Sequence, residues 1–352
     1  MDIREYGWDE HFEKEWRKNC VEGRFPGRII ADYGQKLRVI SEPGELVVSR
    51  PVNKYGNNMQ LAVGDWVALE NSAENQVIQI KFVLPRKTKF SRLAAGIEVK
   101  EQIVAANVDT VFLIQSLNRD FNIRRLERYL VAAWESGALP VVVLSKADLC
   151  DNAADKIAAV YGMAPGVEIH AISCITGEGI ENIKKYFTAG KTVALLGSSG
   201  VGKSTLVNTL AGKELLKTQQ IRESDGRGRH TTTHREILLL PGGGLILDTP
   251  GMRELSLWES DTGMEVMFGD VEELVKMCRF NDCKHRSEPG CAVKEALNAG
   301  KLDIKRWESW LKLQKEQAYL EGRKEVKHML QRKKLGKILA KYQKDFYGGK
   351  ER

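Results

Sequence analysis

Hydrophobic and polar positions divide the chain into three stretches with different periods. Between residues 26 and 92, short runs rich in β-branched residues recur at intervals of about ten residues, and Gly, Pro, Asn and Asp separate them. This spacing predicts a small barrel of about five strands. From residue 102 onward, short apolar runs alternate with segments of helical spacing, which predicts an α/β domain. Residues 292–347 have helical spacing and predict a C-terminal helical region.

The first 25 residues and the predicted barrel each allow two interpretations. Residues 1–25 carry aromatic side chains among charges and predict a short helical arm that packs on the body; contact with a partner is the alternative. For residues 26–95 an OB-like barrel is the most economical fold, and such barrels often bind RNA through one face and two loops. An SH3-like or purely structural barrel fits the same strands.

The strongest chemical motif lies in the α/β stretch. Residues 197–205 match G-x-x-x-x-G-K-[ST] at every fixed position, between a short apolar run and a helix-forming run. Backbone N–H groups of such a loop surround a polyphosphate; Lys203 would reach the β- and γ-phosphates, and the Ser204 hydroxyl would bind Mg²⁺. We therefore expect a nucleoside triphosphate site. Its predicted residues are Gly197, Ser198, Ser199, Gly200, Val201, Gly202, Lys203, Ser204 and Thr205.

Two segments upstream resemble the guanine motifs of GTPases. Ser145-Lys146-Ala147-Asp148 follows a buried strand and is similar to Asn/Thr-Lys-x-Asp, in which the Asp carboxylate accepts from two N–H groups of guanine and the lysine stem lies along the base. Ser173 and Cys174 resemble the Ser-Ala-x loop, whose backbone N–H contacts guanine O6. Ser145 departs from the pattern, because a hydroxyl replaces the group that usually braces the phosphate loop. We expect guanine selectivity; a strand-to-helix turn capped by Asp148 is the alternative.

Two segments downstream of the phosphate loop predict a Mg²⁺ shell. Residues 226–234 combine glycines, charges and threonines and indicate a switch loop, in which Thr232 would bind Mg²⁺; an exposed linker is the alternative. Asp248-Thr249-Pro250-Gly251 follows a short apolar run. Asp248 is placed for the Mg²⁺ shell, and the Gly251 N–H for the γ-phosphate.

The order of these motifs is unusual. In an ordinary GTPase the phosphate loop comes first and the guanine motif last, whereas here both guanine motifs precede the phosphate loop. The same sheet can still form if the domain is circularly permuted. We expect such a domain over residues 96–265, and whatever follows its second switch would respond directly to movement there.

A cluster of cysteines follows the switch region. Cys278-x₄-Cys283-x-His285-x₅-Cys291 offers three thiolates and one imidazole, a complete tetrahedral set for one structural Zn²⁺. Metal binding would supply much of the folding energy of this segment, which we place at residues 266–300. Simple burial of the cysteines is the alternative.

Charge is concentrated at the C-terminal end. The chain carries a formal net charge of +7, and residues 301–352 contain 16 Lys/Arg and 7 Asp/Glu, a balance of +9. This basic helical tail indicates a polyanionic partner, with nucleic acid favoured over membrane. No run of roughly 18 uncharged apolar residues is present, and the charged N-terminus lacks a signal-peptide pattern, so a cytoplasmic protein is expected.

Together these motifs closely resemble the RsgA/YjeQ family of circularly permuted GTPases that depend on the small ribosomal subunit. The resemblance covers nearly the whole chain and implies an assembly factor for late maturation of that subunit. Such a protein would dock on ribosomal RNA through its barrel and zinc domain, hydrolyse GTP to GDP and phosphate, and leave; we expect a monomer. The matching segments are Val63–Val67, Pro85-Arg86, Ala105–Asp109, residues 228–233, residues 248–251, the Cys/His cluster and Glu288-Pro289.

The sequence also bears on catalysis. Met252 stands where many GTPases carry a glutamine that orients water, so we predict low intrinsic turnover and activation by the subunit. His230 is the candidate for orienting the water, with RNA contact or loop stabilisation as alternative roles. Two other classes remain open: an RNA-binding switch that does not hydrolyse GTP, and a P-loop ATPase, against which Asp148 argues.

Overall fold

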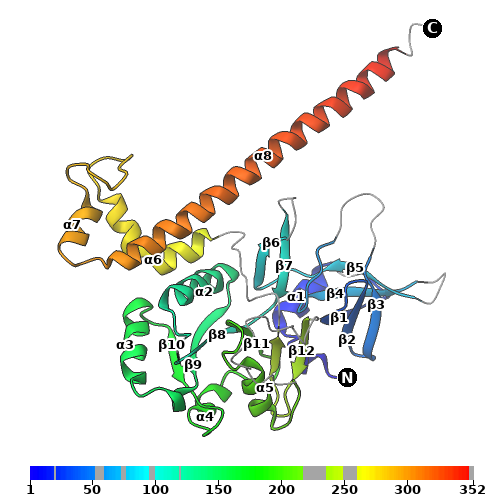
Figure 1. Cartoon of the computed structure of the whole chain (residues 1–352). Coiled ribbons are helices and arrows are strands. Elements are labelled where there is room, and N and C mark those ends of the chain that lie inside the picture. The colour runs from blue at the N-terminus through cyan, green and yellow to red at the C-terminus, as the bar shows by residue number, and fades with distance from the viewer. Residues whose placement is uncertain are drawn as a thin grey trace, which may run out of the picture. The chain divides into compact units, whose positions relative to one another are not determined.

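A computed structural model of the chain describes residues 1–19, 21–51, 59–72, 77–94, 100–118, 120–216, 235–248 and 260–348. These residues belong to two compact units, whose elements are labelled in Figure 1. The first unit contains the described residues of 1–92 and 102–269, and the second contains those of 93–101 and from 270 onward. The N-terminal β domain and the α/β domain therefore belong to one unit, and the Cys/His segment belongs to the other.

The N-terminal arm packs through its aromatic side chains, as predicted. A 3-10 helix, η1 (Ile3–Tyr6), precedes helix α1 (Glu10–Asn19). Trp8 and Phe12 are buried, and the ring centroids of Trp8 and Trp66 lie 4.8 Å apart. Trp66 belongs to the β domain that follows, so packing accounts for these aromatic side chains.

Five strands form the β domain, as the sequence predicts. They are β1 (Arg24–Asp32), β2 (Lys36–Ser41), β3 (Gly44–Ser49), β4 (Trp66–Asn71) and β5 (Ile78–Val83). β1 pairs antiparallel with β2 and β4, β2 pairs with β3, and β4 pairs with β5. Because β3 and β5 also lie next to each other, the curved sheet closes into an OB-like barrel.

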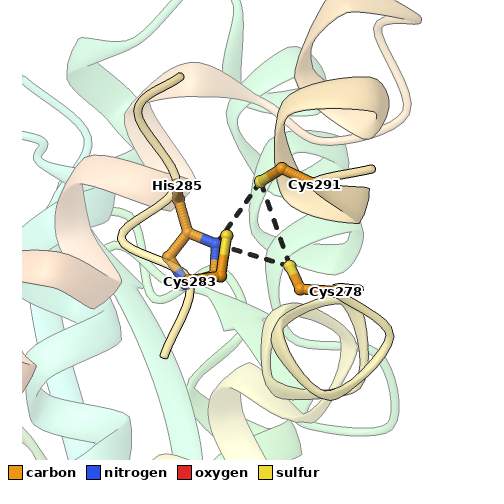
Figure 2. A group of neighbouring side chains, drawn as sticks. All are labelled: Cys278, Cys283, His285 and Cys291. Carbon is orange, nitrogen blue, oxygen red and sulfur yellow. Dashed lines mark hydrogen bonds between the residues drawn. The ribbon is translucent and has the colours of Figure 1, made fainter. Parts of the chain in front are cut away.

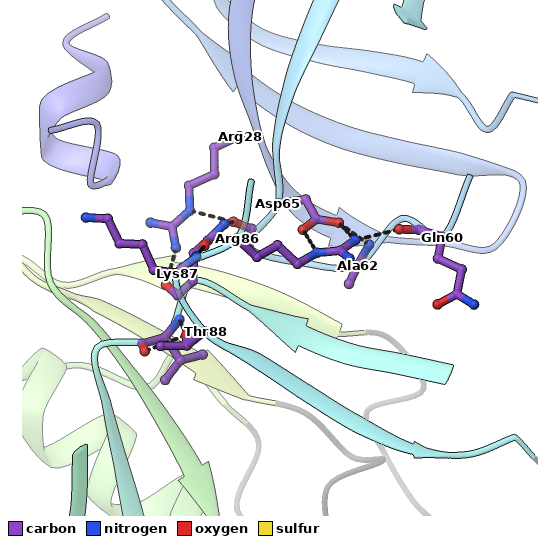
Figure 3. Close-up of polar contacts among 10 residues, drawn as sticks. Arg28, Gln60, Ala62, Asp65, Arg86, Lys87 and Thr88 are labelled. Carbon is purple, nitrogen blue, oxygen red and sulfur yellow. Dashed lines mark hydrogen bonds and ion pairs between the residues drawn. The ribbon is translucent and has the colours of Figure 1, made fainter. Parts of the chain in front are cut away.

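A buried ion pair fixes the turn that leads into β4. The Asp65 carboxylate is fully buried and accepts hydrogen bonds from Arg86 Nε at 2.6 Å, Arg86 Nη2 at 2.8 Å and the Ala62 backbone N–H at 2.8 Å (Figure 3). Gly64 has φ +97°, and a Cβ there would lie 1.9 Å from the Ala106 carbonyl oxygen. Burial raises the pKa of Asp65, and Arg86 offsets this rise in part.

Replacing Arg86 by glutamine should destabilise the first unit by about 3–5 kcal/mol, because a buried carboxylate would lose its partner. Burial would then raise the pKa of Asp65 further above its value in the unfolded chain. The variant should therefore lose stability relative to the wild type as pH rises through that folded pKa. Urea denaturation at pH 5 and pH 8 measures the difference. The double variant D65N/R86Q is the control and should recover most of the stability; an equal loss at both pH values would contradict the account.

The α/β domain is a doubly wound sheet with the phosphate-loop strand inside it. Its strand order is β10-β9-β8-β11-β13-β12, and all neighbours are parallel except β13 and β12. β12 also pairs antiparallel with β1, so the barrel and the α/β domain share one continuous sheet. The strands are β8 (Thr110–Ser116), β9 (Leu139–Ser145), β10 (Glu168–Ala171), β11 (Thr192–Leu196), β12 (Arg235–Leu239) and β13 (Leu245–Asp248). A separate two-stranded sheet, which the sequence did not reveal, contains β6 (Lys89–Leu93) and β7 (Glu101–Ala106).

Helices pack against this sheet and bury its apolar runs. They are α2 (Ile123–Ser136), α3 (Ala153–Met163), α4 (Ile180–Lys184) and α5 (Lys203–Ala211). Alternate residues of β8, β9 and β11 form one core cluster with residues of α4 and α5, while α2 contacts β8 and β9. The predicted bounds of α2 are confirmed: Asn122 caps its N-terminus, and Gly137, at φ +81°, ends it.

Three helices complete the described chain: α6 (Asp261–Lys276), α7 (Ala292–Asn298) and α8 (Ile304–Gly348). In α6, Phe268 has non-helical angles of φ −122° and ψ 26°, one residue before the first unit ends. The predicted helical region from residue 292 is interrupted, because Gly300 adopts φ +68° and the Asp303 side chain accepts from the Arg306 backbone N–H at the start of α8. Trp307 and Trp310 on α8 are buried, as their helical spacing predicts, and their rings stack. Ile304 shares this spacing but is 55% exposed at the first residue of α8, so its predicted place on the packed face is wrong.

Candidate guanine nucleotide site and metal centre

The predicted nucleotide motifs lie at one edge of the sheet. β8, β9, β10, β11 and β13 run parallel, so their carboxyl ends meet at the same edge, where α/β sheets bind their ligands. Ser145 ends β9, Ser173 follows β10, Gly197 follows β11 and Asp248 ends β13. The fold therefore places at one edge segments as far apart in the sequence as Ser145 and Asp248.

The phosphate loop takes a compact conformation between β11 and α5. Gly197 passes so close to β8 that a Cβ there would lie 2.4 Å from the Ile114 carbonyl oxygen. Gly200 and Gly202 adopt positive φ angles of 77° and 96°. Lys203 begins α5 and is buried, and its Nζ donates to the carbonyl oxygens of Gly197 at 2.7 Å and Ser198 at 2.6 Å. The ammonium group is thus held against the loop that would surround the phosphates.

Ser145 braces this loop although it departs from the usual motif. Its hydroxyl donates to the Val201 carbonyl oxygen at 2.6 Å and also lies 3.3 Å from the Gln115 carbonyl oxygen. Lys146, in a left-handed conformation with φ +58°, donates from Nζ to the Gly200 carbonyl oxygen at 2.8 Å. A buried hydroxyl therefore supplies the brace that an amide or threonine provides in the common motif.

We expect the S145A variant to bind GTP about five- to tenfold more weakly, because one buried hydrogen bond to the loop, worth roughly 1 kcal/mol, is lost. The loss should appear mainly as faster nucleotide dissociation, measured by chase of a fluorescent guanine nucleotide. Ser145→Thr keeps the hydroxyl and is the matched control. Equal dissociation rates in S145A and wild type would show that the hydroxyl does not brace the loop.

The two guanine motifs lie side by side. The Ala147 backbone N–H donates to the Ile172 carbonyl oxygen at 3.1 Å, which ties the Ser145–Asp148 segment to the end of β10. Asp148 lies in the short 3-10 helix η2 (Ala147–Leu149) with its side chain exposed. Ser173 is buried, and its hydroxyl oxygen accepts from the backbone N–H groups of Ile175 and Thr176, each at 3.2 Å. Cys174 follows it, packed against the core cluster.

The structure adds Asp120, a residue that our sequence reasoning missed. Its carboxylate accepts from the Ser198 hydroxyl at 2.7 Å and from Arg125 at 2.9 Å, so the β8–α2 loop holds the phosphate loop from a second side. Burial alone would raise the pKa of Asp120, but the Ser198 and Arg125 hydrogen bonds outweigh it and hold the pKa below its ordinary value. The only sequence signal was the position of Asp120 after a buried strand, in the same place as the other motifs.

Only part of the predicted Mg²⁺ shell can be placed. Ser204 lies in the first turn of α5, and Asp248 lies at the end of β13, opposite Leu195 of the phosphate-loop strand and Glu236 of β12. These two side chains come from the elements that flank the phosphate loop and could hold Mg²⁺. The predicted residues His230, Thr232 and Gly251 lie outside the described residues, as does Met252.

The predicted zinc ligands come together in the second unit (Figure 2). The ligand atoms of Cys278, Cys283, His285 and Cys291 all lie within 4.8 Å of one another. Nδ1 of His285 is 3.5 Å from the Sγ atoms of both Cys278 and Cys291, and those two Sγ atoms are 3.9 Å apart. Sulfur atoms at the corners of a tetrahedron with Zn–S bonds of about 2.3 Å lie about 3.8 Å apart. Both the donor set and its spacing therefore fit one zinc ion.

The loop between these ligands has its own internal support. Glu288 accepts hydrogen bonds from the backbone N–H groups of Lys284 at 2.9 Å, Arg286 at 2.8 Å and Ser287 at 2.9 Å. A hydrogen bond from its own backbone N–H, followed by those from Arg286, Lys284 and Ser287, lowers the pKa of Glu288 to about 2. His285 adopts φ +57°, and its ring packs edge-on against Trp307, with centroids 5.2 Å apart. The Glu288-Pro289 segment thus shapes the loop that presents His285.

The fold and the site define a P-loop GTPase domain with circularly permuted motifs, between a β barrel and a segment with a Cys/His cluster. The chain belongs to the RsgA GTPase family, whose model matches residues 83–258. A second model, described as 50S ribosome-binding GTPase, matches residues 192–335.

Individual relatives agree with this assignment. "Small ribosomal subunit biogenesis GTPase RsgA 1" of Listeria innocua is 45% identical over 325 residues, which cover 91% of this chain and 90% of that protein. The crystal structure of YjeQ from Thermotoga maritima, at 29% identity, matches 84% of this chain and 99% of its own with a TM-score of 0.60. YloQ, described as a circularly permuted GTPase, matches 85% of this chain with a TM-score of 0.56; at 22% identity it supports the fold alone.

Proposed function

We propose that this GTPase acts in the late maturation of the small ribosomal subunit, binds its ribosomal RNA and hydrolyses GTP to GDP and phosphate while bound. The observation that carries the proposal is the similarity, over about nine-tenths of both chains, to relatives named small ribosomal subunit biogenesis GTPase RsgA. The basic C-terminal tail, residues 301–352 with a net charge of +9, is consistent with an RNA partner.

We further propose that the protein is monomeric and cytoplasmic. Among the described helices, none is both long and apolar enough to cross a membrane.

The residues at the sheet edge have defined roles in this proposal. Lys203 and the backbone N–H groups of residues 198–205 would bind the β- and γ-phosphates, while Asp148 would select guanine. Ser204 and Asp248 would hold Mg²⁺, with Thr232 as a third ligand, and the ion would neutralise charge on the phosphates. One Zn²⁺ would hold the Cys278–Cys291 segment in shape.

Sedimentation with purified subunits tests the partner. The protein, loaded with a non-hydrolysable GTP analogue, is expected to co-sediment with small ribosomal subunits, and binding should weaken with GDP. The family model described as 50S ribosome-binding GTPase makes the large subunit the alternative partner. Co-sedimentation with large subunits alone would overturn the proposal.

Replacing His230 by alanine tests the proposed source of the water-orienting group. If His230 orients the attacking water, the subunit-stimulated rate should fall by about 10²-fold or more, the range for a positioned acid–base group, while GTP affinity stays close to the wild-type value. Single-turnover hydrolysis at saturating subunit separates the chemical step from binding. A normal stimulated rate would remove His230 from this role.

A further inference from the structure

Strand β1 of the barrel pairs directly with strand β12 of the GTPase domain. β1 pairs with β12 through Ala31–Glu236 and Asp32–Arg235, and Glu236 in turn lies opposite Asp248 of β13. A single row across three strands therefore joins the barrel to the residue that we place in the Mg²⁺ shell. β12 also begins directly after residues 226–234, the predicted switch loop. A displacement of β12 relative to β1 would therefore also displace Glu236, the cross-strand partner of Asp248.

Two arginines, Arg50 and Arg235, lie next to Asp32 at this junction. Arg235 is its cross-strand partner, and such partners place their side chains on the same face, about 5 Å apart at Cβ. Arg50, next to β3, donates from Nη2 to the Asp32 carboxylate at 2.8 Å and from Nε to the Gly34 carbonyl oxygen at 2.8 Å. Arg92 of β6, whose Nε donates to Gln102, also acts on Arg235 electrostatically. We call Arg50, Arg92 and Arg235 the junction arginines.

Two positive charges, those of Arg92 and Arg50, and one negative charge, that of Asp32, act on Arg235. Its pKa is lowered first by burial and then by the charge of Arg92, while Asp32 opposes this effect and the charge of Arg50 adds to it. Arg38 on the neighbouring strand β2 is a contrast, because Glu45 and Glu236 flank it at 2.8 Å and 2.6 Å and raise its pKa. Arg38 therefore lies between two carboxylates, whereas the carboxylate opposite Arg235, that of Asp32, already pairs with Arg50. An anion close to Arg235 would relieve this repulsion.

We propose that the junction arginines bind a backbone phosphate of RNA, and that its binding there is transmitted through β12 to the nucleotide site. The inference rests on the proposed function for the identity of the RNA. Guanidinium groups match the geometry of phosphate oxygens and can donate two parallel hydrogen bonds. Arg50 is already fixed by two hydrogen bonds, so little side-chain entropy is lost when it binds. Arg235 begins β12, so a phosphate bound to it is held at the strand that pairs with β13, which ends at Asp248.

R235Q and R50Q test the proposal, with R24Q as the matched control. Arg24 also lies on β1 but pairs with Glu70 at 3.1 Å, away from the junction. A fluorescein-labelled 20-nucleotide oligouridylate is titrated over a salt series. The slope of log K against log salt should fall by about 0.7 for each lost phosphate contact in R235Q and R50Q, and remain unchanged in R24Q.

The same variants are then assayed for GTP turnover with and without small subunits. Intrinsic turnover should stay at the wild-type rate, whereas half-maximal stimulation should require about tenfold more subunit, the cost of one charge-assisted hydrogen bond.

Each outcome decides part of the proposal. Wild-type slope and stimulation in both R235Q and R50Q would overturn it. Weaker stimulation with an unchanged slope would overturn the assignment to RNA and indicate contact with protein. A reduced slope with normal stimulation would overturn the transmission through β12. If small subunits do not stimulate the wild type, the proposed function fails, and the salt slope still tests the phosphate site by itself.

Discussion

Replacing Cys291 by serine is expected to abolish zinc binding and unfold the segment between Cys278 and Cys291. Structural zinc sites in small peptides contribute about 10–16 kcal/mol to folding at neutral pH, more than this segment's few buried apolar side chains can replace. Cys291 faces His285 and Cys278, and it also accepts from the Lys294 backbone N–H as the N-cap of α7. A serine hydroxyl can accept the same cap hydrogen bond, so C291S removes the metal ligand and not the cap. Metal analysis and hydrogen exchange of residues 270–303 measure the two effects.

The control for this experiment is Cys150→Ser. Cys150 is a free cysteine in the α/β domain, outside the cluster, so its replacement removes a thiol without removing a ligand. C150S should bind one zinc per chain and show wild-type exchange. Retention of one zinc and of exchange protection in C291S would contradict the account, because three remaining ligands should not hold the segment closed.

Replacing Asp148 by asparagine is expected to weaken GTP binding by about 10²- to 10⁴-fold. The carboxylate would accept two hydrogen bonds from guanine, each worth about 1.5–3 kcal/mol with a charged partner. An asparagine instead offers an N–H donor, which suits the C2 carbonyl of xanthine, so D148N should gain affinity for xanthosine triphosphate. Competition against a fluorescent guanine nucleotide measures both affinities.

Asp151→Asn is the matched control, because Asp151 is an exposed aspartate three residues further along the same loop. It should leave both affinities unchanged. Wild-type GTP affinity in D148N would contradict the placement of the base against the η2 turn, and equal binding of ATP and GTP by the wild type would favour the ATPase alternative.

The nucleotide motifs could be predicted because they depend on local backbone chemistry. A glycine is required at position 197, where the chain passes close to β8, and glycine is favoured at positions 200 and 202, where φ is positive. All three glycines lie within nine consecutive residues, so the motif can be recognised from the sequence alone. The carboxyl ends of parallel strands then place the separate motifs at one edge, whatever their order in the chain. The Cys/His spacing likewise predicted a cluster that the structure assembles.

Contacts between distant segments could not be predicted in this way. Nothing in the residues of β1 or β12 specifies that they pair across about 200 positions, because either strand could have bonded with other edges. The brace from Ser145 to Val201 depends on the distance between β9 and the phosphate loop, which the motif alone does not contain. Asp120 was missed for the same reason, since its role arises from a contact with Ser198, 78 residues away.

GTP turnover by the full chain, measured with and without purified small ribosomal subunits at moderate salt, tests whether the protein is a GTPase that the small subunit activates. We predict slow intrinsic multiple turnover, because Met252 cannot orient water, and strong stimulation by small but not large subunits. Absence of stimulation, with GTP still bound, would contradict the proposed function and leave an RNA-binding switch or a different RNA partner. The GTPase fold and the RsgA family membership would stand in either case.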